Sequence, residues 1–144
     1  MIEQDTIKLL RECDAGIKMG TDSIDEVIGH VNSRAMKNSL ETCRREHGKL
    51  GGECDQLLNS FGDSGKNPNP MAEGMSWVKT NVKLAFDGSD ATIAELMTDG
   101  CNMGIKSLNR YLHQYEAADE RSKDITKRLI NLEKQLVNDM QGYL

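Results

Sequence analysis

Apolar residues recur along most of the chain at alternating spacings of three and four. A run that repeats every seven residues in this way is typical of amphipathic helices that pack side by side. The alternation of single apolar and polar residues that marks β-strands is absent. The helices that the pattern predicts are 3–31, 34–61, 71–86, 91–115 and 118–143. The sequence therefore predicts an all-α fold.

An internal repeat sets the expected topology. Residues 16–28 align with residues 100–112 at a shift of 84, and both segments follow the pattern G-x-x-M-G-x-x-S-(I/L)-x-x-x-(I/L). We interpret the repeat as two related helical hairpins, 1–61 and 90–143, which pack as a pseudo-two-fold four-helix bundle. The helix at 71–86 then belongs to the long crossover between them. The matched glycines are expected where the first helices of the two hairpins approach most closely.

Composition narrows the class of protein. The 144 residues form one expected domain, 1–144, with 38% apolar residues, only 2 prolines and 4% aromatic residues, which disfavours β-barrels and sandwiches. A net charge of −5 gives no electrostatic basis for binding nucleic acid. No apolar run approaches the ~20 residues that span a bilayer, and the N-terminus is acidic rather than signal-like. We therefore expect a cytoplasmic protein without membrane contact.

The four cysteines are spread over the chain as Cys13, Cys43, Cys54 and Cys101. None forms a C-x-x-C pair, so zinc-ribbon and thioredoxin motifs are not present. Each falls on an apolar helix face. We therefore expect reduced thiols that are buried as small apolar groups.

A few polar residues interrupt the apolar faces. Asp14 and His47 lie on the faces themselves, Asp99 follows Thr98 at the repeat position of Asp14, and Glu133 corresponds to His47 in the second hairpin. Counting from each hairpin turn at about 1.5 Å per residue places Asp14, His47, Asp99 and Glu133 within about 5 Å of one height. The sequence therefore predicts one polar layer near the middle of the bundle.

Two interpretations of this layer remain open. A dinuclear site of the ferritin type uses a Glu-x-x-His motif from each second helix, but Leu50 and Leu136 stand where the two histidines would be. The layer could instead hold a single metal ion through Asp14, His47, Asp99 and Glu133. Alternatively, it is an internal hydrogen-bond network in which a carboxylate holds His47 and fixes the helix register.

Other chemistry has no support in the sequence. G-x-S-x-G, Gly-rich phosphate loops and H-E-x-x-H do not occur. No catalytic residue and no cofactor are therefore expected, apart from the single metal ion considered above.

Several stretches resemble a bacterial ferritin-like family of unknown function. They are the Cys13-Asp14-Ala15-Gly16 region, the crossover with Trp77, the stretch Glu95-Leu96-Met97-Thr98-Asp99-Gly100 and the helical tail. The resemblance covers nearly the whole chain and implies a ferritin-like bundle with an ancestral metal site, without implying an established activity.

The expected function follows from the broken ligand set. We predict a non-catalytic structural, stress-related or protein-interaction module. The alternative is a metal-binding (iron, manganese or zinc) or redox protein that uses a degenerate ferritin-type site. Met71 and Met75 on the crossover helix suggest a docking surface for a protein partner or a second copy, because methionine adapts to varied partners.

Overall fold

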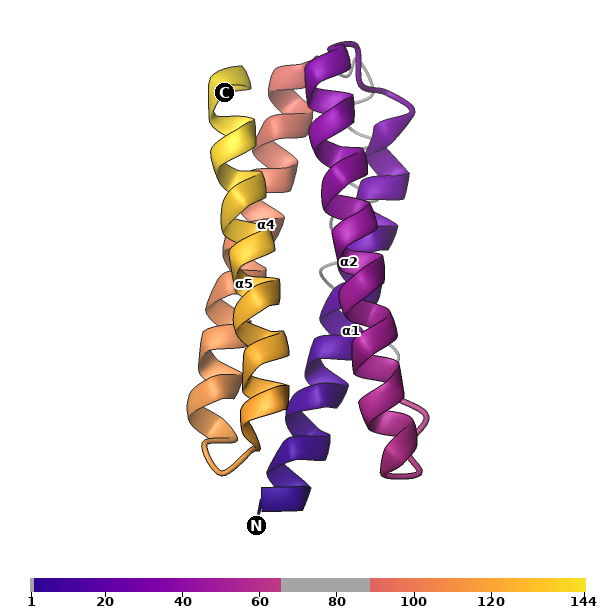
Figure 1. Ribbon diagram of the computed structural model, residues 1–144. Coiled ribbons are helices and arrows are strands. Elements are labelled where there is room, and N and C mark those ends of the chain that lie inside the picture. The colour runs from indigo at the N-terminus through magenta and orange to yellow at the C-terminus, as the bar shows by residue number, and fades with distance from the viewer. Residues whose placement is uncertain (1, 66–88) are drawn as a thin grey trace.

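Four long helices run side by side as a bundle (Figure 1). The computed structural model describes residues 2–65 and 89–144. Its helices are α1 (Ile2–Ile28), α2 (Arg34–Ser60), α4 (Asp90–Gln114), α5 (Glu120–Met140) and the short 3₁₀ helix η2 (Gln141–Tyr143). No strand occurs in these two ranges, so the all-α prediction is confirmed for them. The helix predicted at 71–86 lies outside the described residues.

Side-chain caps define where three of the helices begin. Ser33, Ser89 and Asp119 are the N-caps of α2, α4 and α5. Each accepts a hydrogen bond from the backbone N–H three residues later, at 3.2, 3.2 and 2.8 Å respectively. Such caps satisfy N–H groups that have no partner inside the helix.

The chain forms two antiparallel hairpins, α1–α2 and α4–α5 (Figure 1). The end of α2 and the start of α4 lie at opposite ends of the bundle. Hydrogen bonds join the hairpins at both ends. Asp90 accepts from the backbone N–H groups of Asn32 and Ser33 at 2.8 and 2.9 Å, and Thr6 accepts from the N–H of Asp119 at 2.8 Å. The two-hairpin arrangement predicted from the repeat is therefore present.

Two apolar clusters fill the bundle interior, one toward each end. One contains Ile24, Cys43, Cys101 and Leu136, and the other contains Ile17, Leu50, Leu108 and Leu129. Each helix contributes to both clusters, and the residue that falls between them on each helix is Gly20, His47, Gly104 or Glu133. A layer of two glycines and two polar residues therefore lies between two apolar layers.

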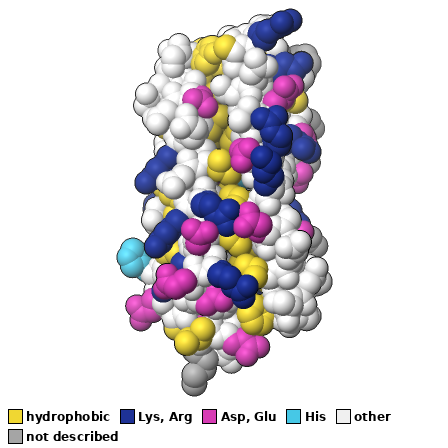
Figure 2. Space-filling model, viewed as in Figure 1, with side chains coloured by type: hydrophobic (Ala, Val, Ile, Leu, Met, Phe, Trp, Pro, Cys, Tyr) yellow, Lys and Arg dark blue, Asp and Glu magenta, His cyan; other side chains and the backbone are white. Residues whose placement is uncertain are grey.

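Charges of both signs are mixed over the face that Figure 2 shows, with narrow strips of apolar side chains between the helices. Arg128, for example, contacts both Glu53 on α2 and Asp124 on its own helix, at 2.7 and 2.9 Å. Exposed pairs of this kind contribute little to stability, typically about 0–1 kcal/mol. None of the described helices has the length and apolar character that crossing a membrane requires.

Candidate functional site

The polar layer is centred on a contact between the two hairpins. The ring of His47 on α2 lies with Nε2 2.9 Å from Oε1 of Glu133 on α5. On its other side, Nδ1 lies 2.8 Å from the backbone carbonyl oxygen of Cys43 and 3.5 Å from the sulfur of the same residue. His47 is 1% exposed and the Glu133 side chain 12% exposed. Both ring nitrogens of a buried imidazole are therefore occupied by partners within the protein.

These partners determine where the protons lie. A carbonyl oxygen only accepts, so Nδ1 carries a proton and donates to Cys43. Nε2 faces a carboxylate, which favours a second proton between the ring and Glu133. Burial lowers the pKa of His47, but the hydrogen bonds with Cys43 and Glu133 and the charge of Glu133 outweigh burial and raise it to about 10. At neutral pH the layer therefore contains an imidazolium paired with a carboxylate.

Glycines on the facing helices make room for this pair. A Cβ placed on Gly20 of α1 would lie 3.0 Å from both Cδ2 and Nε2 of His47, and one placed on Gly104 of α4 would lie 3.8 Å from the carboxylate of Glu133. Ordinary carbon contacts are about 3.5–4.0 Å. The imidazole therefore fits at its present position because residue 20 has no side chain.

The remaining members of the predicted layer lie elsewhere. Asp14 is buried, but its carboxylate forms an ion pair with Lys18 at 2.8 Å, and it lies six residues, about 9 Å, along α1 from Gly20. Asp99 is exposed on α4. The prediction that four polar residues share one layer is therefore wrong for these two. For Asp14 the height counted from the turns was wrong, and for Asp99 a height does not determine which way the side chain faces.

The donor set does not fit a metal centre of the ferritin type. The His47 nitrogens already contact a carbonyl and Glu133, and Leu50 and Leu136, which occupy the positions of the missing histidines, are buried in the apolar clusters. Within residues 2–65 and 89–144, no three His, Cys, Asp or Glu side chains are grouped so that they could share a metal ion.

All four cysteines are buried, as predicted. Burial raises the pKa of Cys13 to about 12, and it also raises the pKa values of Cys54 and Cys101. Cys13 lies 3.1 Å from the hydroxyl of Thr126, a contact that joins α1 to α5. Because the thiolate is the reactive form, thiols with raised pKa values are poor nucleophiles and poor metal ligands.

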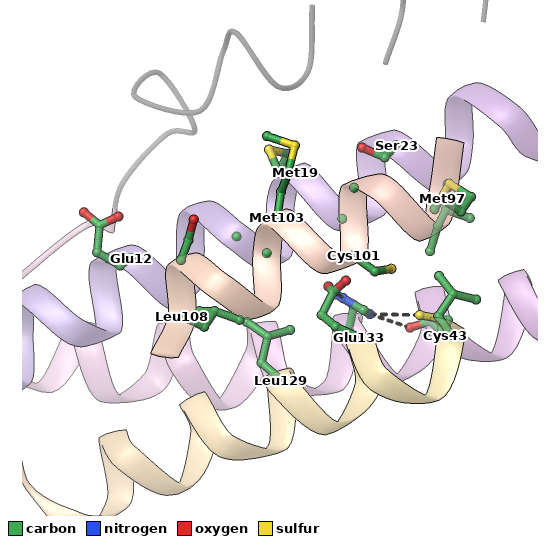
Figure 3. A pocket seen from close by; sticks show the side chains of 18 of the residues that line it. Glu12, Met19, Ser23, Cys43, Met97, Cys101, Met103, Leu108, Leu129 and Glu133 are labelled. Carbon is green, nitrogen blue, oxygen red and sulfur yellow. Dashed lines mark hydrogen bonds and ion pairs between the residues drawn. The ribbon is translucent and has the colours of Figure 1, made fainter. Parts of the chain in front are cut away.

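A cavity of about 50 Å³ lies between α1 and α4 (Figure 3). The internal repeat provides two of its walls, because Gly16, Met19 and Gly20 of α1 line it together with the equivalent Gly100, Met103 and Gly104 of α4. His47 and Glu133 also line it, and in Figure 3 Glu133 lies across the cavity from Met19 and Met103. The polar pair therefore forms part of the wall of a mostly apolar space.

The prediction that the repeat glycines mark the closest approach of α1 and α4 is wrong. Among the residues that the structure describes, a Cβ on Gly100 would meet no atom within 4 Å, and one on Gly16 or Gly104 would meet only side chains of α5. The repeat thus leaves space between the first helices. The repeat identifies the matched glycines in the sequence, but it does not show that Gly20 lies beside His47 and Gly104 beside Glu133.

Comparison with known proteins found no match to the chain among protein-family models, curated proteins or solved structures.

Proposed function

We propose that the protein is a non-catalytic helical bundle of ferritin-like plan that acts as a structural, stress-related or protein-interaction module. The proposal rests on the hydrogen bonds of His47, because both of its ring nitrogens have partners within the protein, the carbonyl oxygen of Cys43 and the carboxylate of Glu133. A histidine that acts as a ligand or a base needs a free nitrogen for metal or substrate.

The His47–Glu133 pair has a structural role in this proposal. It joins α2 to α5, and hence the first hairpin to the second, through a charge-assisted hydrogen bond in the middle of the bundle. Sliding one hairpin by a helical turn, about 5.4 Å, would separate the two groups and leave each charge in an apolar layer. The pair therefore favours a single register between the hairpins.

The ferritin-like plan is supported by the topology. The end of α2 and the start of α4 lie at opposite ends of the bundle, and bundles of this kind use one long crossover. A partner or second copy that docks on the predicted 71–86 helix belongs to the same proposal, and that helix lies outside the described residues.

Elemental analysis of protein purified without a chelator tests the proposal. We expect iron, manganese and zinc far below one ion per chain, and no oxidation of added Fe(II) above the buffer rate. His113 provides the matched control, because its Nδ1 lies 3.1 Å from the carbonyl oxygen of Asn109 in the same i−4 geometry, but on the surface. Stoichiometric metal that is lost in His47→Gln and retained in His113→Gln would replace the proposal with the metalloprotein alternative.

A further inference from the structure

The cavity beside the His47–Glu133 pair has room only for a small molecule. Its volume of about 50 Å³ is a few times the ~10–15 Å³ that one water molecule requires. It therefore accommodates a molecule of about two to four heavy atoms, whereas longer chains do not fit. The thiols of Cys43 and Cys101 line this cavity together with the polar pair. A small reagent in the cavity would thus lie close to two sulfur atoms.

The two thiols that line the cavity have different surroundings. The sulfur of Cys43 lies 3.5 Å from Nδ1 of His47, which belongs to an imidazolium at neutral pH. Cys101 instead interacts with Glu133, and burial together with that carboxylate raises the pKa of Cys101. A positive charge beside a sulfur promotes its reaction as a nucleophile, whereas a negative charge opposes it. Of the two thiols, Cys43 is therefore the one placed to react.

The other two thiols provide an internal reference. Cys13 and Cys54 do not line the cavity, and each is 0% exposed. Their sulfur atoms lie 3.1 Å from the hydroxyl of Thr126 and from the carbonyl oxygen of Leu10, respectively. Burial raises the pKa values of both thiols. Neither has the two features that Cys43 combines, an adjacent imidazolium and a cavity wall.

Two methionines make the cavity accessible to a small molecule. Met19 and Met103 line it on the side opposite Glu133 (Figure 3). Met103 is 52% exposed. Unbranched thioether side chains change rotamer readily. A molecule a little larger than water can therefore enter by side-chain movement, without separation of the helices.

We propose that hydrogen peroxide enters this cavity and oxidises Cys43 to a sulfenic acid. A lone pair of the sulfur forms a bond to one peroxide oxygen, and the O–O bond breaks. The second oxygen leaves with the electron pair of that bond, takes the proton of the thiol and becomes water. The sulfur is thereby oxidised by two electrons and the peroxide is reduced by two. The charge of His47 opposes the negative charge that develops on the leaving oxygen.

This reaction is a stoichiometric modification of one side chain. A structural bundle needs no reactive thiol, so the inference goes beyond the proposed function. It can fail without affecting that function, which is tested by metal content rather than by thiol chemistry.

Trapping with dimedone, which alkylates sulfenic acids, tests the inference on the unmodified protein. The reduced protein is treated with hydrogen peroxide and dimedone at neutral pH, and the adducts are located and timed by peptide mass spectrometry. We expect the adduct at Cys43 to form at least about tenfold faster than at Cys13, Cys54 or Cys101. No adduct at Cys43, or equal rates at the four thiols, would overturn the inference.

A bulkier peroxide tests whether the reaction occurs inside the cavity. tert-Butyl hydroperoxide has the same O–O bond but carries a group too large for a space of about 50 Å³. The rates of the two peroxides at Cys43 are compared in the folded protein and in urea-unfolded protein, which corrects for their different intrinsic reactivity. We expect the preference for hydrogen peroxide to be at least about tenfold greater in the folded protein. Equal preferences would show that Cys43 reacts outside the cavity.

Two leucine substitutions locate the site. Gly100 lines the cavity and Gly52 is exposed on α2, and a Cβ at either position would meet no described residue within 4 Å. We expect Gly100→Leu to slow the oxidation of Cys43 at least about tenfold, because the new side chain occupies the cavity, and Gly52→Leu to leave the rate unchanged. Equal rates in the two variants would contradict the location.

His47→Gln tests the part played by the imidazolium. The substitution removes the positive charge beside Cys43 and should slow its oxidation at least about tenfold. A loss of stability alone would do the opposite, because it would expose all four thiols and raise their rates. A rate at Cys43 equal to or above that of the wild type would show that His47 does not promote the reaction.

Discussion

The two hairpins share one repeat but place different chemistry at its centre. The first hairpin carries Gly20 and His47 in the middle layer, and the second carries Gly104 and Glu133 at the equivalent positions. Two glutamates facing each other would repel, and two imidazolium groups would do the same. One base and one acid instead form a hydrogen-bonded pair at 2.9 Å. The two hairpins therefore share the glycine positions and carry complementary groups at the polar positions.

Away from the centre the hairpins differ further. Asp14 on α1 is buried and bonded to Lys18, whereas Thr98, its counterpart on α4, has a buried hydroxyl without a hydrogen-bond partner among the described residues. An unsatisfied buried group of this kind typically costs about 1–3 kcal/mol. The similarity between the hairpins therefore does not extend to Asp14 and Thr98, although these two positions correspond in the repeat.

Among the substitutions considered, removing one member of the His47–Glu133 pair should change the free energy of unfolding most. Breaking a buried ion pair from one side typically costs about 3–5 kcal/mol, because the remaining charge is left buried. We expect His47→Leu and Glu133→Leu each to lower the free energy of unfolding by this amount. The double variant should unfold with a free energy near that of the wild type, or higher, because no charge remains. Urea unfolding of the wild type, the two single variants and the double variant gives the interaction energy of the pair as a double-mutant cycle.

His113→Leu is the control, because it removes an exposed histidine with the same i−4 carbonyl contact. It should change stability by less than about 0.5 kcal/mol, as surface substitutions usually do. Additive losses in the double variant would show that His47 and Glu133 do not act as a pair. The interpretation that the two hairpins carry complementary charges in the middle layer would then be wrong.

The contribution of the His47–Glu133 pair should also make the stability of the protein depend on pH. The folded pKa of His47, about 10, lies above its unfolded value near 6.5. The stabilisation is therefore fully present below about pH 6.5 and decreases as the pH rises toward about 10. We expect the free energy of unfolding to fall by up to a few kcal/mol over this window, at about 1.4 kcal/mol per pH unit. Urea unfolding at several pH values measures the decrease.

The interval between about pH 6.5 and 8.5 is the most informative part of the window. Above it, the buried thiols also destabilise the folded state, because they ionise more readily when unfolded. In His47→Gln the slope in this interval should be nearly flat, whereas His113→Gln should keep the wild-type slope. If the free energy of unfolding of His47→Gln fell with pH as steeply as that of the wild type, the pH dependence would come from groups other than His47.

Much of the fold could be predicted from periodicity, because apolar spacing reports directly on helices and on the faces that they bury. The repeat at a shift of 84 predicted two hairpins, and both are present. Boundaries differ by a few residues, as at the end of α1, where the predicted helix continued to residue 31 and the observed one ends at Ile28. Helix ends depend on a few local hydrogen bonds and are therefore less constrained by sequence pattern.

The candidate site was only half predictable. His47 interrupts an apolar face, which predicts that it points inward, and Glu133 corresponds to His47 in the second hairpin. The prediction was wrong for Asp99 because this residue lies one position from the apolar face, and one residue turns a helical side chain by about 100°. The role of Gly20 could not be derived from α1 alone, because it depends on a ring contributed by α2. Relations between helices require the packed structure.

The smallest expected effect separates the two matched glycines. Replacing Gly by Ala within a helix gains about 1 kcal/mol in helix propensity. At Gly104 the new Cβ would lie at an ordinary 3.8 Å from Glu133, so Gly104→Ala should raise the free energy of unfolding by up to about 1 kcal/mol. At Gly20 it would lie 3.0 Å from His47, whose ring is held on both sides.

Gly20→Ala should therefore be less stable than Gly104→Ala, by about 1–3 kcal/mol, since overpacking forces the imidazole away from its two partners. Gly48 is exposed on α2, and a Cβ there would meet no described residue within 4 Å, so Gly48→Ala reports the propensity gain alone. Combining Gly20→Ala with His47→Leu and Glu133→Leu should restore part of the propensity gain, because the rigid ring is then absent. If Gly20→Ala and Gly104→Ala stabilise the protein equally, the imidazole has room to move, and the two hairpins present equivalent surfaces to the middle layer.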